Sequence, residues 1–556
     1  MNSPLQKSSS RRTRSRLGPI VVLALVCSLV ACSNNSATDS NSSDSTAVVS
    51  GPARDLIIAR AMDTTTLDPE RMWCDTCMII LKATYEQMIN VDPADVSHLL
   101  PGLAEKWEVN DTSTEFTFHL NPKATFADGT PVTSADVKWS WERIANIKAG
   151  ASFMPTGLES VETPDPLTAI AKFKAPNAPF LSISAAAMGM SIVNSKSATT
   201  QAVAKSGPGA DLDKAATWFD KGNSAGSGMY TITDYKAGES ITMTRNEKYW
   251  GTKAKYPSIT IKNVADASTQ LQMLQQGDVD IAMNIAFDSL TQLQGDSNIV
   301  AEPLDSFNFI YLNLAPWAAG GKDLADVKVR QAIRLAIDYN ALLQNTLAGH
   351  GRLQATVIPN GLPGTEGLTL PAQDIAKAKE LMASAGKSAG FTIDAQFSDA
   401  NIYNVQMTTM YQQIQQDLKK INIRLNLVPI AAAKYADVYL AKKIALGNVY
   451  FAPDYMDAAE YITYFARVPG SNRGGWAPTG VTTADDDATQ TATLAKALAI
   501  ADGTKRGVLY KEIGQAMIND AYSIPLLNPQ VLFAHQKDIG GIGLSPCCTL
   551  DVTLLK

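Results

Sequence analysis

The sequence predicts an α/β fold, in which strands and helices alternate along the whole body of the chain. Apolar and polar residues alternate over several short stretches, as they do in half-buried strands: 114–120, 228–235 and 239–245. Apolar residues recur at spacings of three and four over longer stretches, as they do in amphipathic helices: 133–147, 326–349, 374–385 and 403–420. The chain has 556 residues, which exceeds what one hydrophobic core usually holds, so two or three lobes are expected.

Local signals fix some of these elements more closely. Lys236-Ala237-Gly238 predicts a turn that joins 228–235 and 239–245 as a hairpin. A hydroxyl at Thr133 and a carboxylate at Asp136 predict the start of a helix, because such side chains bind the free N–H groups of the first turn. Arg330 and Arg334 lie four residues apart, close to Asp326, and this spacing predicts ion pairing on the surface of a helix.

The first residues predict export. Four arginines precede an uncharged stretch from Leu17 to Ala31, which is too short to span a bilayer comfortably, so residues 1–31 are interpreted as a signal peptide. Leu29-Val30-Ala31-Cys32 resembles the bacterial lipobox, in which the cysteine carries a diacylglycerol. Residues 32–54 then form a polar Ser/Asn/Asp-rich linker between this lipidation site and the folded body. The alternative is an ordinary signal peptide in which Cys32 falls by chance.

The charge of the mature chain excludes some partners. Removing residues 1–31 takes away five basic residues and no acidic one, so the net charge changes from −6 to −11. An acidic body argues against nucleic acid as a partner and against adhesion to anionic lipid.

The remaining cysteines are a C-x-x-C pair, Cys74 and Cys77, and the adjacent Cys547 and Cys548. In an exported protein, four thiols favour two disulfides, for which three connectivities exist. A zinc site built from all four is an alternative, although adjacent cysteines chelate one tetrahedral ion poorly. Free or redox-active thiols are the third reading.

Ordered motifs across the body resemble the family 5 extracellular solute-binding proteins of peptide and nickel importers, from about residue 55 to the C-terminus. The motifs that carry the resemblance are LDP at 67–69, LPGLAEKW at 100–107, FTFHLNPKATFADGTPVTSADVKWSWERI at 116–144, GSGMY at 226–230, RNEKYW at 245–250, QGDVD at 276–280, FIYLNL at 309–314, DVKVRQAIRLAID at 326–338, FAPDYMD at 451–457 and SIPL at 523–526.

The resemblance implies a two-lobed, periplasmic-binding-protein-like fold of type II, cluster C, with an extra small domain inserted in lobe I. Its expected parts are 55–90 plus 215–305 plus 525–556 as lobe I, 91–214 as the extra domain and 306–524 as lobe II. Crossing segments near 305 and 525 would form the hinge.

The resemblance further implies a monomeric lipoprotein, outside the cell membrane, that captures short peptides and delivers them to the permease subunits and ATPases of an ABC importer. It implies no catalysis and no cofactor. The alternatives are a non-peptide solute (a nickel chelate, haem or a sugar), and a peptide sensor or chaperone on the same scaffold.

Asp454 is the expected partner of the ligand. In peptide-binding members of the family, the aspartate of the matching segment pairs with the ligand's α-ammonium, a strong charge-assisted contact. The alternative is a solvated loop residue or a helix cap. The strand at 307–313 and the loop after 67–69 are candidate edges to which an extended peptide adds as a strand.

Further candidate ligand contacts are aromatic side chains that the resemblance brings to the cleft and one arginine that could meet a ligand carboxylate; aromatics at such positions are also common in cores, and the arginine could be a plain surface residue. These candidates are Trp73, Tyr311, Tyr450, Tyr455, Trp476 and Arg473.

An enzyme is disfavoured. Gly222-Asn223-Ser224-Ala225-Gly226 spells G-x-S-x-G, but a nucleophile elbow follows a strand and opens a helix, whereas a loop here leads into a predicted strand. The sequence contains no H-E-x-x-H, Walker or dinucleotide-binding motif.

Overall fold

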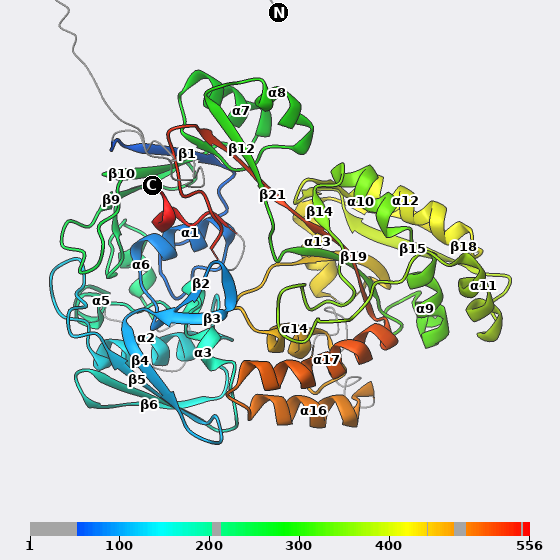
Figure 1. Cartoon of the computed structure of the whole chain (residues 1–556), viewed down its shortest axis with the longest axis horizontal. Coiled ribbons are helices and arrows are strands. Elements are labelled where there is room, and N and C mark those ends of the chain that lie inside the picture. The colour runs from blue at the N-terminus through cyan, green and yellow to red at the C-terminus, as the bar shows by residue number, and fades with distance from the viewer. Residues whose placement is uncertain (1–52, 203–212, 442, 472–484, 546–548) are drawn as a thin grey trace, which may run out of the picture. The chain divides into compact units, whose positions relative to one another are not determined.

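The computed structural model describes residues 53–202, 213–441, 443–471, 485–545 and 549–556. The described residues belong to one compact unit that spans Val48–Lys556. They form an α/β fold with two large sheets, which confirms the predicted fold class (Figure 1). Within the described ranges, no helix is long and apolar enough to cross a membrane.

The first large sheet has seven strands in the order β12-β21-β11-β1-β10-β9-β8. Its centre is β1 (Leu56–Arg60), which pairs in parallel with β10 (Ser258–Asn263) and β11 (Ile281–Ala282). The predicted hairpin is confirmed as β8 (Tyr230–Lys236) and β9 (Ser240–Arg245). The other strands and the helices associated with this sheet are β12 (Ile299–Leu304), β21 (Val531–Gln536), α1 (Asp75–Thr84), α7 (Ala267–Gln276) and α8 (Leu290–Gln294).

A smaller domain lies between α1 and β8 in the chain. It has a hairpin of β2 (Ile89–Asp92) with β3 (Asp95–Pro101) and a four-stranded antiparallel sheet. In sheet order these four strands are β4 (Ala104–Val109), β5 (Glu115–Leu120), β7 (Thr168–Phe173) and β6 (Leu158–Asp165). Its helices are α2 (Ser134–Ile147), α3 (Phe180–Ile183), α4 (Ala187–Met190), α5 (Ser195–Ala202) and α6 (Ala215–Phe219). The predicted start of α2 is confirmed, because the Asp136 carboxylate accepts the backbone N–H of Thr133 and closes a capping box.

The second large sheet has six strands in the order β14-β20-β13-β19-β15-β18. In that order they are β14 (Gly351–Arg352), β20 (Ser523–Pro529), β13 (Phe309–Leu314), β19 (Leu446–Phe451), β15 (Phe391–Ser398) and β18 (Ile423–Ile430). A further two-stranded sheet joins β16 (Asn401–Ile402) and β17 (Val405–Gln406). The helices of this half are α9 (Val327–Ala336), α10 (Tyr339–Leu347), α11 (Ile375–Ser384), α12 (Met407–Lys419), α13 (Ala432–Leu440), α14 (Ala458–Phe465), α16 (Ala488–Leu498) and α17 (Gly503–Asp520).

Two predictions about this half are wrong in detail. The strand expected as an exposed edge at 307–313 is β13, which pairs with β19 on one side and β20 on the other, so it has no free edge there. The single helix expected over 326–349 is two helices. Ile337 is extended, with a ψ of 129°, and Asp338 starts α10 by accepting the N–H of Ala341.

Arg330 and Arg334 do not form surface ion pairs. Both side chains are buried, and the Arg330 guanidinium donates to the carbonyls of Asp520 (2.7 Å) and Leu324 (2.8 Å) and lies 3.9 Å from the ring centre of Tyr522. A guanidinium can be buried in this way because carbonyl oxygens and an aromatic face take the place of its water.

The chain passes between the two large sheets twice (Figure 1), from β12 to β13 and from β20 to β21. These crossings are bonded to each other: Ser306 Oγ donates to the carbonyl of Pro529 (2.9 Å), and Asn528 Nδ2 donates to the carbonyls of Ser306 (3.1 Å) and Asn308. The expected boundary between 524 and 525 falls inside β20, which belongs wholly to the second sheet, so the crossing lies at 530.

Candidate functional site

One hydrogen bond joins the two halves where the sequence places its ligand residues. Trp73 lies just before α1 in the first half, and Asp454 lies just after β19 in the second half. The indole N–H of Trp73 donates to Asp454 Oδ1 over 2.9 Å. The Trp73 side chain is 57% exposed and meets the ring of Phe153 edge to face, with 5.9 Å between centroids. Trp73 therefore combines a polar contact with an open aromatic face.

The segment that carries Asp454 is fixed from the side of the second half. Glu460, in the first turn of α14, accepts the backbone N–H of Asp454 (2.9 Å) and that of Tyr455 (3.1 Å). Asp457 caps α14 by accepting the N–H of Ala459 and forms a 2.8 Å ion pair with Arg506 of α17. The backbone around Asp454 is thus held in place by the carboxylates of Glu460 and Asp457, which lie at the start of α14.

The surroundings of Asp454 disfavour its ionised form. Burial raises the pKa of Asp454 to about 6, although the hydrogen bond from Trp73 acts in the opposite direction. Burial also raises the pKa of Glu460 well above its ordinary value, and the charge of Asp454 adds to this effect. The negative charge of each of these two carboxyl groups disfavours ionisation of the other. The arrangement is suited to a hydrogen-bonding cation such as an ammonium group.

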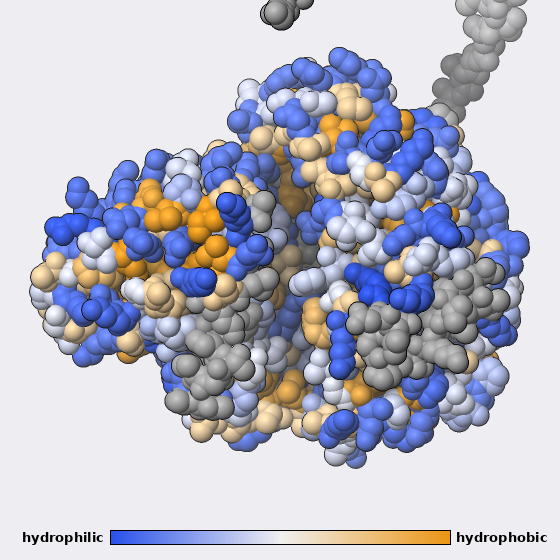
Figure 2. Space-filling model, turned by 180° about the vertical axis from the view of Figure 1, so that it is seen from behind, coloured by the Kyte–Doolittle hydropathy of each residue, from blue (hydrophilic) through white to orange (hydrophobic). Residues whose placement is uncertain are grey.

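A small cavity borders this segment. It has a volume of about 20 Å³ and is lined by Asp454, Tyr455 and Met456, together with residues of α1 and of the smaller domain, among them Met78 and Ala186. That volume holds about one water molecule. On one face of the body, a hollow runs between walls of hydrophilic and hydrophobic residues (Figure 2).

The start of α1 holds the predicted C-x-x-C pair. Cys74 and Cys77 form a disulfide, so the disulfide prediction is confirmed for these two residues. Asp63 accepts the backbone N–H groups of Asp75 (3.0 Å) and Thr76 (2.9 Å) and so satisfies the first turn of the helix. Among the described residues, no group of three or more His, Cys, Asp or Glu side chains could hold a metal ion.

The other predicted aromatic residues differ in their surroundings. Tyr450, at the end of β19, is 50% exposed and packs edge to face on Tyr403 at 5.4 Å. Tyr455 is half-buried and packs against the core of the first half. Cys74, which follows Trp73 in the chain, packs against the same core. Tyr311 is fully buried and packs on Phe465 in the core of the second half, so it is not taken further as a ligand contact.

Several predicted residues lie outside the described ranges: Cys32, Arg473, Trp476, Cys547 and Cys548.

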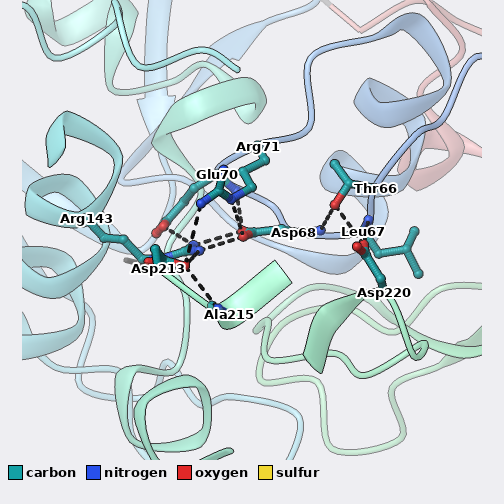
Figure 3. Close-up of polar contacts among 9 residues, drawn as sticks. All are labelled: Thr66, Leu67, Asp68, Glu70, Arg71, Arg143, Asp213, Ala215 and Asp220. Atoms are coloured by element: carbon teal, nitrogen blue, oxygen red, sulfur yellow. Dashed lines mark hydrogen bonds and ion pairs between the residues drawn. The ribbon is translucent and has the colours of Figure 1, made fainter. Parts of the chain in front are cut away.

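A buried ionic cluster anchors the loop at 67–69, which was considered as a peptide edge. The guanidinium of Arg143, from α2, binds Asp68 (2.8 Å), Asp213 (2.8 Å) and Glu70 (Figure 3). Arg143 and Asp68 are fully buried. The Asp68 carboxylate is therefore bound to Arg143 of the same chain. The loop lies at the contact between the first sheet and the smaller domain.

Sequence reasoning missed Glu460 and the Arg143 cluster. Glu460 was detectable as a single acidic residue within the otherwise apolar stretch Ala458-Ala459-Glu460-Tyr461-Ile462, because a charge on the buried face of a helix needs a partner. The partners of Arg143 are dispersed from 68 to 213 in sequence, and no local signal connects them.

Comparisons with known proteins agree with this architecture. The family model of the bacterial extracellular solute-binding proteins, family 5 Middle, matches residues 98–473. The probable D,D-dipeptide-binding periplasmic protein DdpA of Escherichia coli K12 is 28% identical over 507 residues, which cover 88% of this chain and 92% of the relative. The glutathione-binding protein GsiB of the same strain is 25% identical over 502 residues, covering 89% and 93%.

Solved structures share the fold. The periplasmic binding protein DppA from Helicobacter pylori, in complex with the peptide STSA, aligns with a TM-score of 0.71 at 20% identity, over 90% of this chain and 97% of that one. The match of the family model over most of the chain, together with the two-sheet fold, shows the family of this protein. It belongs to the bacterial extracellular solute-binding proteins of family 5, which are exported proteins that bind substrates rather than enzymes.

Proposed function

We propose that this chain is the substrate-binding lipoprotein of an ABC importer for short peptides, and that it captures them by their free amino end at Asp454. The names of its relatives support the ligand class, since DdpA is described as binding D,D-dipeptides and GsiB as binding glutathione, a short peptide. Membership of this family of solute-binding proteins supports a role in an ABC importer. In such an importer, separate permease subunits and ATPases complete the transporter.

The observation that carries the proposal is the setting of Asp454. Its carboxylate accepts a hydrogen bond from the other half of the protein, and burial raises its pKa to about 6. An ammonium group there would form charge-assisted hydrogen bonds with the carboxylate. A ligand with a blocked amino end cannot form this charge-assisted contact and should bind more weakly.

The surroundings of Asp454 suit a ligand with varied side chains. Trp73 and Tyr450 present exposed aromatic faces, and Tyr455 is half-buried beside Asp454. Flat apolar surfaces tolerate side chains of many shapes because they make no directional contacts. Arg473 and Trp476 are proposed as contacts with the rest of the ligand, with the Arg473 guanidinium meeting its carboxylate.

Capture and delivery require the two halves to close on the ligand. The crossings at 304–309 and 529–531 would form the hinge, because these two segments connect the large sheets within the described part of the chain. A ligand bound to both Trp73 and Asp454 contacts each half and so favours the closed state. The closed protein then docks on the permease, and the lipid at Cys32 keeps it close to the membrane.

Calorimetry with matched peptides tests the proposal. Trialanine with a free amino end should bind, and its N-acetylated form should bind at least about tenfold more weakly, because one ion pair is lost. Asp454→Asn should remove that difference, while Asp111→Asn, a substitution at an exposed loop carboxylate, should keep it. Equal affinity of the wild-type chain for both peptides would remove Asp454 from the amino-end site.

The lipid anchor is tested separately. The wild-type chain should partition with membranes after expression in a bacterium, and a Cys32→Ser chain should be recovered in the aqueous fraction. A Cys32→Ser chain that stays with the membranes would contradict the anchor.

A further inference from the structure

We propose that the Cys74–Cys77 disulfide is a thiol–disulfide exchange site that captures peptides with a cysteine as their first residue. The inference rests on the proposed peptide site, because that site puts the ammonium of the first ligand residue at Asp454. It adds a reversible covalent bond to the non-covalent capture described above, for one chemical class of ligand: a thiol next to a free amine.

The location of the disulfide is the first argument. Cys74 directly follows Trp73, whose indole N–H binds Asp454 over 2.9 Å. Cys74 is half-buried, whereas Cys77 is 1% exposed in the core of the first half. An incoming thiolate therefore meets the sulfur of Cys74, and Cys77 is the leaving group. Within the described residues, Cys74 and Cys77 form the one disulfide, and it directly follows Trp73, which binds the proposed partner of the ligand's ammonium.

The disulfide is not needed to hold the helix, which is the second argument. Asp63 already satisfies the N–H groups of Asp75 and Thr76, and the residues from Thr76 to Leu81 are all buried. A bridge between residues three apart also restricts the unfolded chain least, since stabilisation by a disulfide grows with the length of the loop it closes. A disulfide at this position therefore adds little to the stability of the fold.

Charge around α1 selects the kind of thiol. The carboxylates of Asp63 and Asp75 lie at the start of the helix, and the guanidinium of Arg60 lies 3.9 Å from Asp63. Burial raises the pKa of Asp75, with the charge of Asp63 adding to this and Arg60 opposing it. This excess of negative charge repels anionic thiols and attracts a thiol that carries an ammonium group.

The exchange step is balanced without an added oxidant. The ligand thiol loses its proton to solvent, and its thiolate attacks Sγ of Cys74. The bond between Cys74 and Cys77 breaks, the ligand–Cys74 disulfide forms, and the Cys77 thiolate leaves and takes a proton from solvent. Release is the reverse, in which the Cys77 thiolate attacks Cys74 and frees the ligand thiol.

Mass spectrometry of trapped protein tests the inference. The mature, non-reduced chain is mixed with L-cysteinyl-L-alanine, quenched with acid and N-ethylmaleimide, and digested. We expect the dipeptide on Cys74 and the maleimide on Cys77. N-acetyl-cysteinylalanine should form the adduct at least about tenfold more slowly, because it lacks the ammonium that positions the thiol. L-seryl-L-alanine should bind reversibly, as measured by calorimetry, and form no adduct.

The matched probes separate the two proposals. Reversible binding of serylalanine with no adduct from cysteinylalanine would overturn the exchange site and leave the peptide site intact. An adduct that forms equally fast with the acetylated peptide, or only on Cys547 or Cys548, would also overturn the exchange site. No binding of serylalanine and no adduct would overturn both proposals.

Discussion

At the scale of single residues, the site depends on how the Asp454 carboxylate is positioned and on how its surroundings shift its pKa. Asp454 is held by two means: its backbone N–H donates to Glu460, and its side chain accepts from Trp73. Burial raises the pKa of Asp454 to about 6, and the hydrogen bond from Trp73 opposes this shift.

This pKa predicts how peptide affinity depends on pH. A bound ammonium favours the ionised form of Asp454, so affinity should be high above pH 6 and should fall by up to about tenfold for each pH unit below it, as the carboxyl takes up a proton. Affinity should fall again above about pH 8, where the ligand amine loses its proton. Calorimetry from pH 5 to 9 measures this profile.

Asp454→Asn provides the control for that profile. Its affinity should be low and should not fall further between pH 7 and pH 5, because the titrating group is absent. The account is contradicted at this scale if the wild-type affinity is constant over the same range.

The Arg143 cluster predicts a pH dependence of stability. Three carboxylates, of Asp68, Glu70 and Asp213, share the guanidiniums of Arg143 and Arg71 (Figure 3). Burial raises the pKa of Glu70 from 4.5 to about 8, against the attraction of Arg143. Folding therefore favours the protonated form of Glu70, and its contribution to stability is fully present below pH 4.5 and is lost as the pH rises through about 8.

Glu70→Gln tests this reasoning, because glutamine keeps the shape and does not ionise. The free energy of unfolding of the wild type should decrease between pH 5 and 8 by roughly 1–3 kcal/mol more than that of Glu70→Gln. Urea unfolding at several pH values measures both. Parallel curves for the two chains would show that Glu70 does not carry a raised pKa.

Single residues were predicted unevenly from the sequence. Asp454 and Trp73 could be placed near each other by resemblance alone, and they form a hydrogen bond. Tyr311 could not be distinguished from a cleft residue, because alternation in a strand buried on both faces does not mark which side chains reach solvent. The burial of Arg330 depends on carbonyls at 324 and 520, and its spacing from Asp326 carries no information about them.

At the scale of elements, side-chain caps decide where helices begin. The helix α2 begins at a capping box, and α10 begins because Asp338 accepts an N–H of its own first turn. The sequence predicted the first, since a hydroxyl stands three residues before a carboxylate. It did not predict the second, because apolar spacing continues through Ile337 and hides the change of direction.

Replacing Asp136 is expected to lower the stability of the protein, because this residue caps one helix and contacts the start of another. Besides the N–H of Thr133, its carboxylate accepts the N–H (3.0 Å) and the hydroxyl (2.7 Å) of Ser195, so it connects α2 to the start of α5. Asp136→Ala should lower the free energy of unfolding by about 2–3 kcal/mol, since buried N–H groups lose their acceptor. Urea unfolding at pH 7 measures the loss. Asp111→Ala, in an exposed turn, should change stability by less than about 0.5 kcal/mol, and an equal loss in both variants would contradict the role of Asp136.

At the scale of the whole molecule, two sheets joined by two adjacent crossings explain how one chain surrounds a solute. The resemblance of ordered motifs predicted the two large parts and the small domain. It did not give the exact position of the second crossing. The strand β20 pairs with β13, which lies far earlier in the chain, and such long-range pairing produces no local sequence signal near residue 525. The crossing at 530 lies where Gln530 Nε2 donates to Asp305 Oδ1 over 3.0 Å.

The central claim is that this chain captures short peptides by their amino end, and the ligand it carries tests that claim most directly. The mature chain, purified from a bacterium without refolding, is denatured, and the released small molecules are identified by mass spectrometry. We predict a mixture of short peptides with free amino ends, much reduced in Asp454→Asn purified in parallel. A nickel chelate, haem or a sugar in place of peptides would contradict the account.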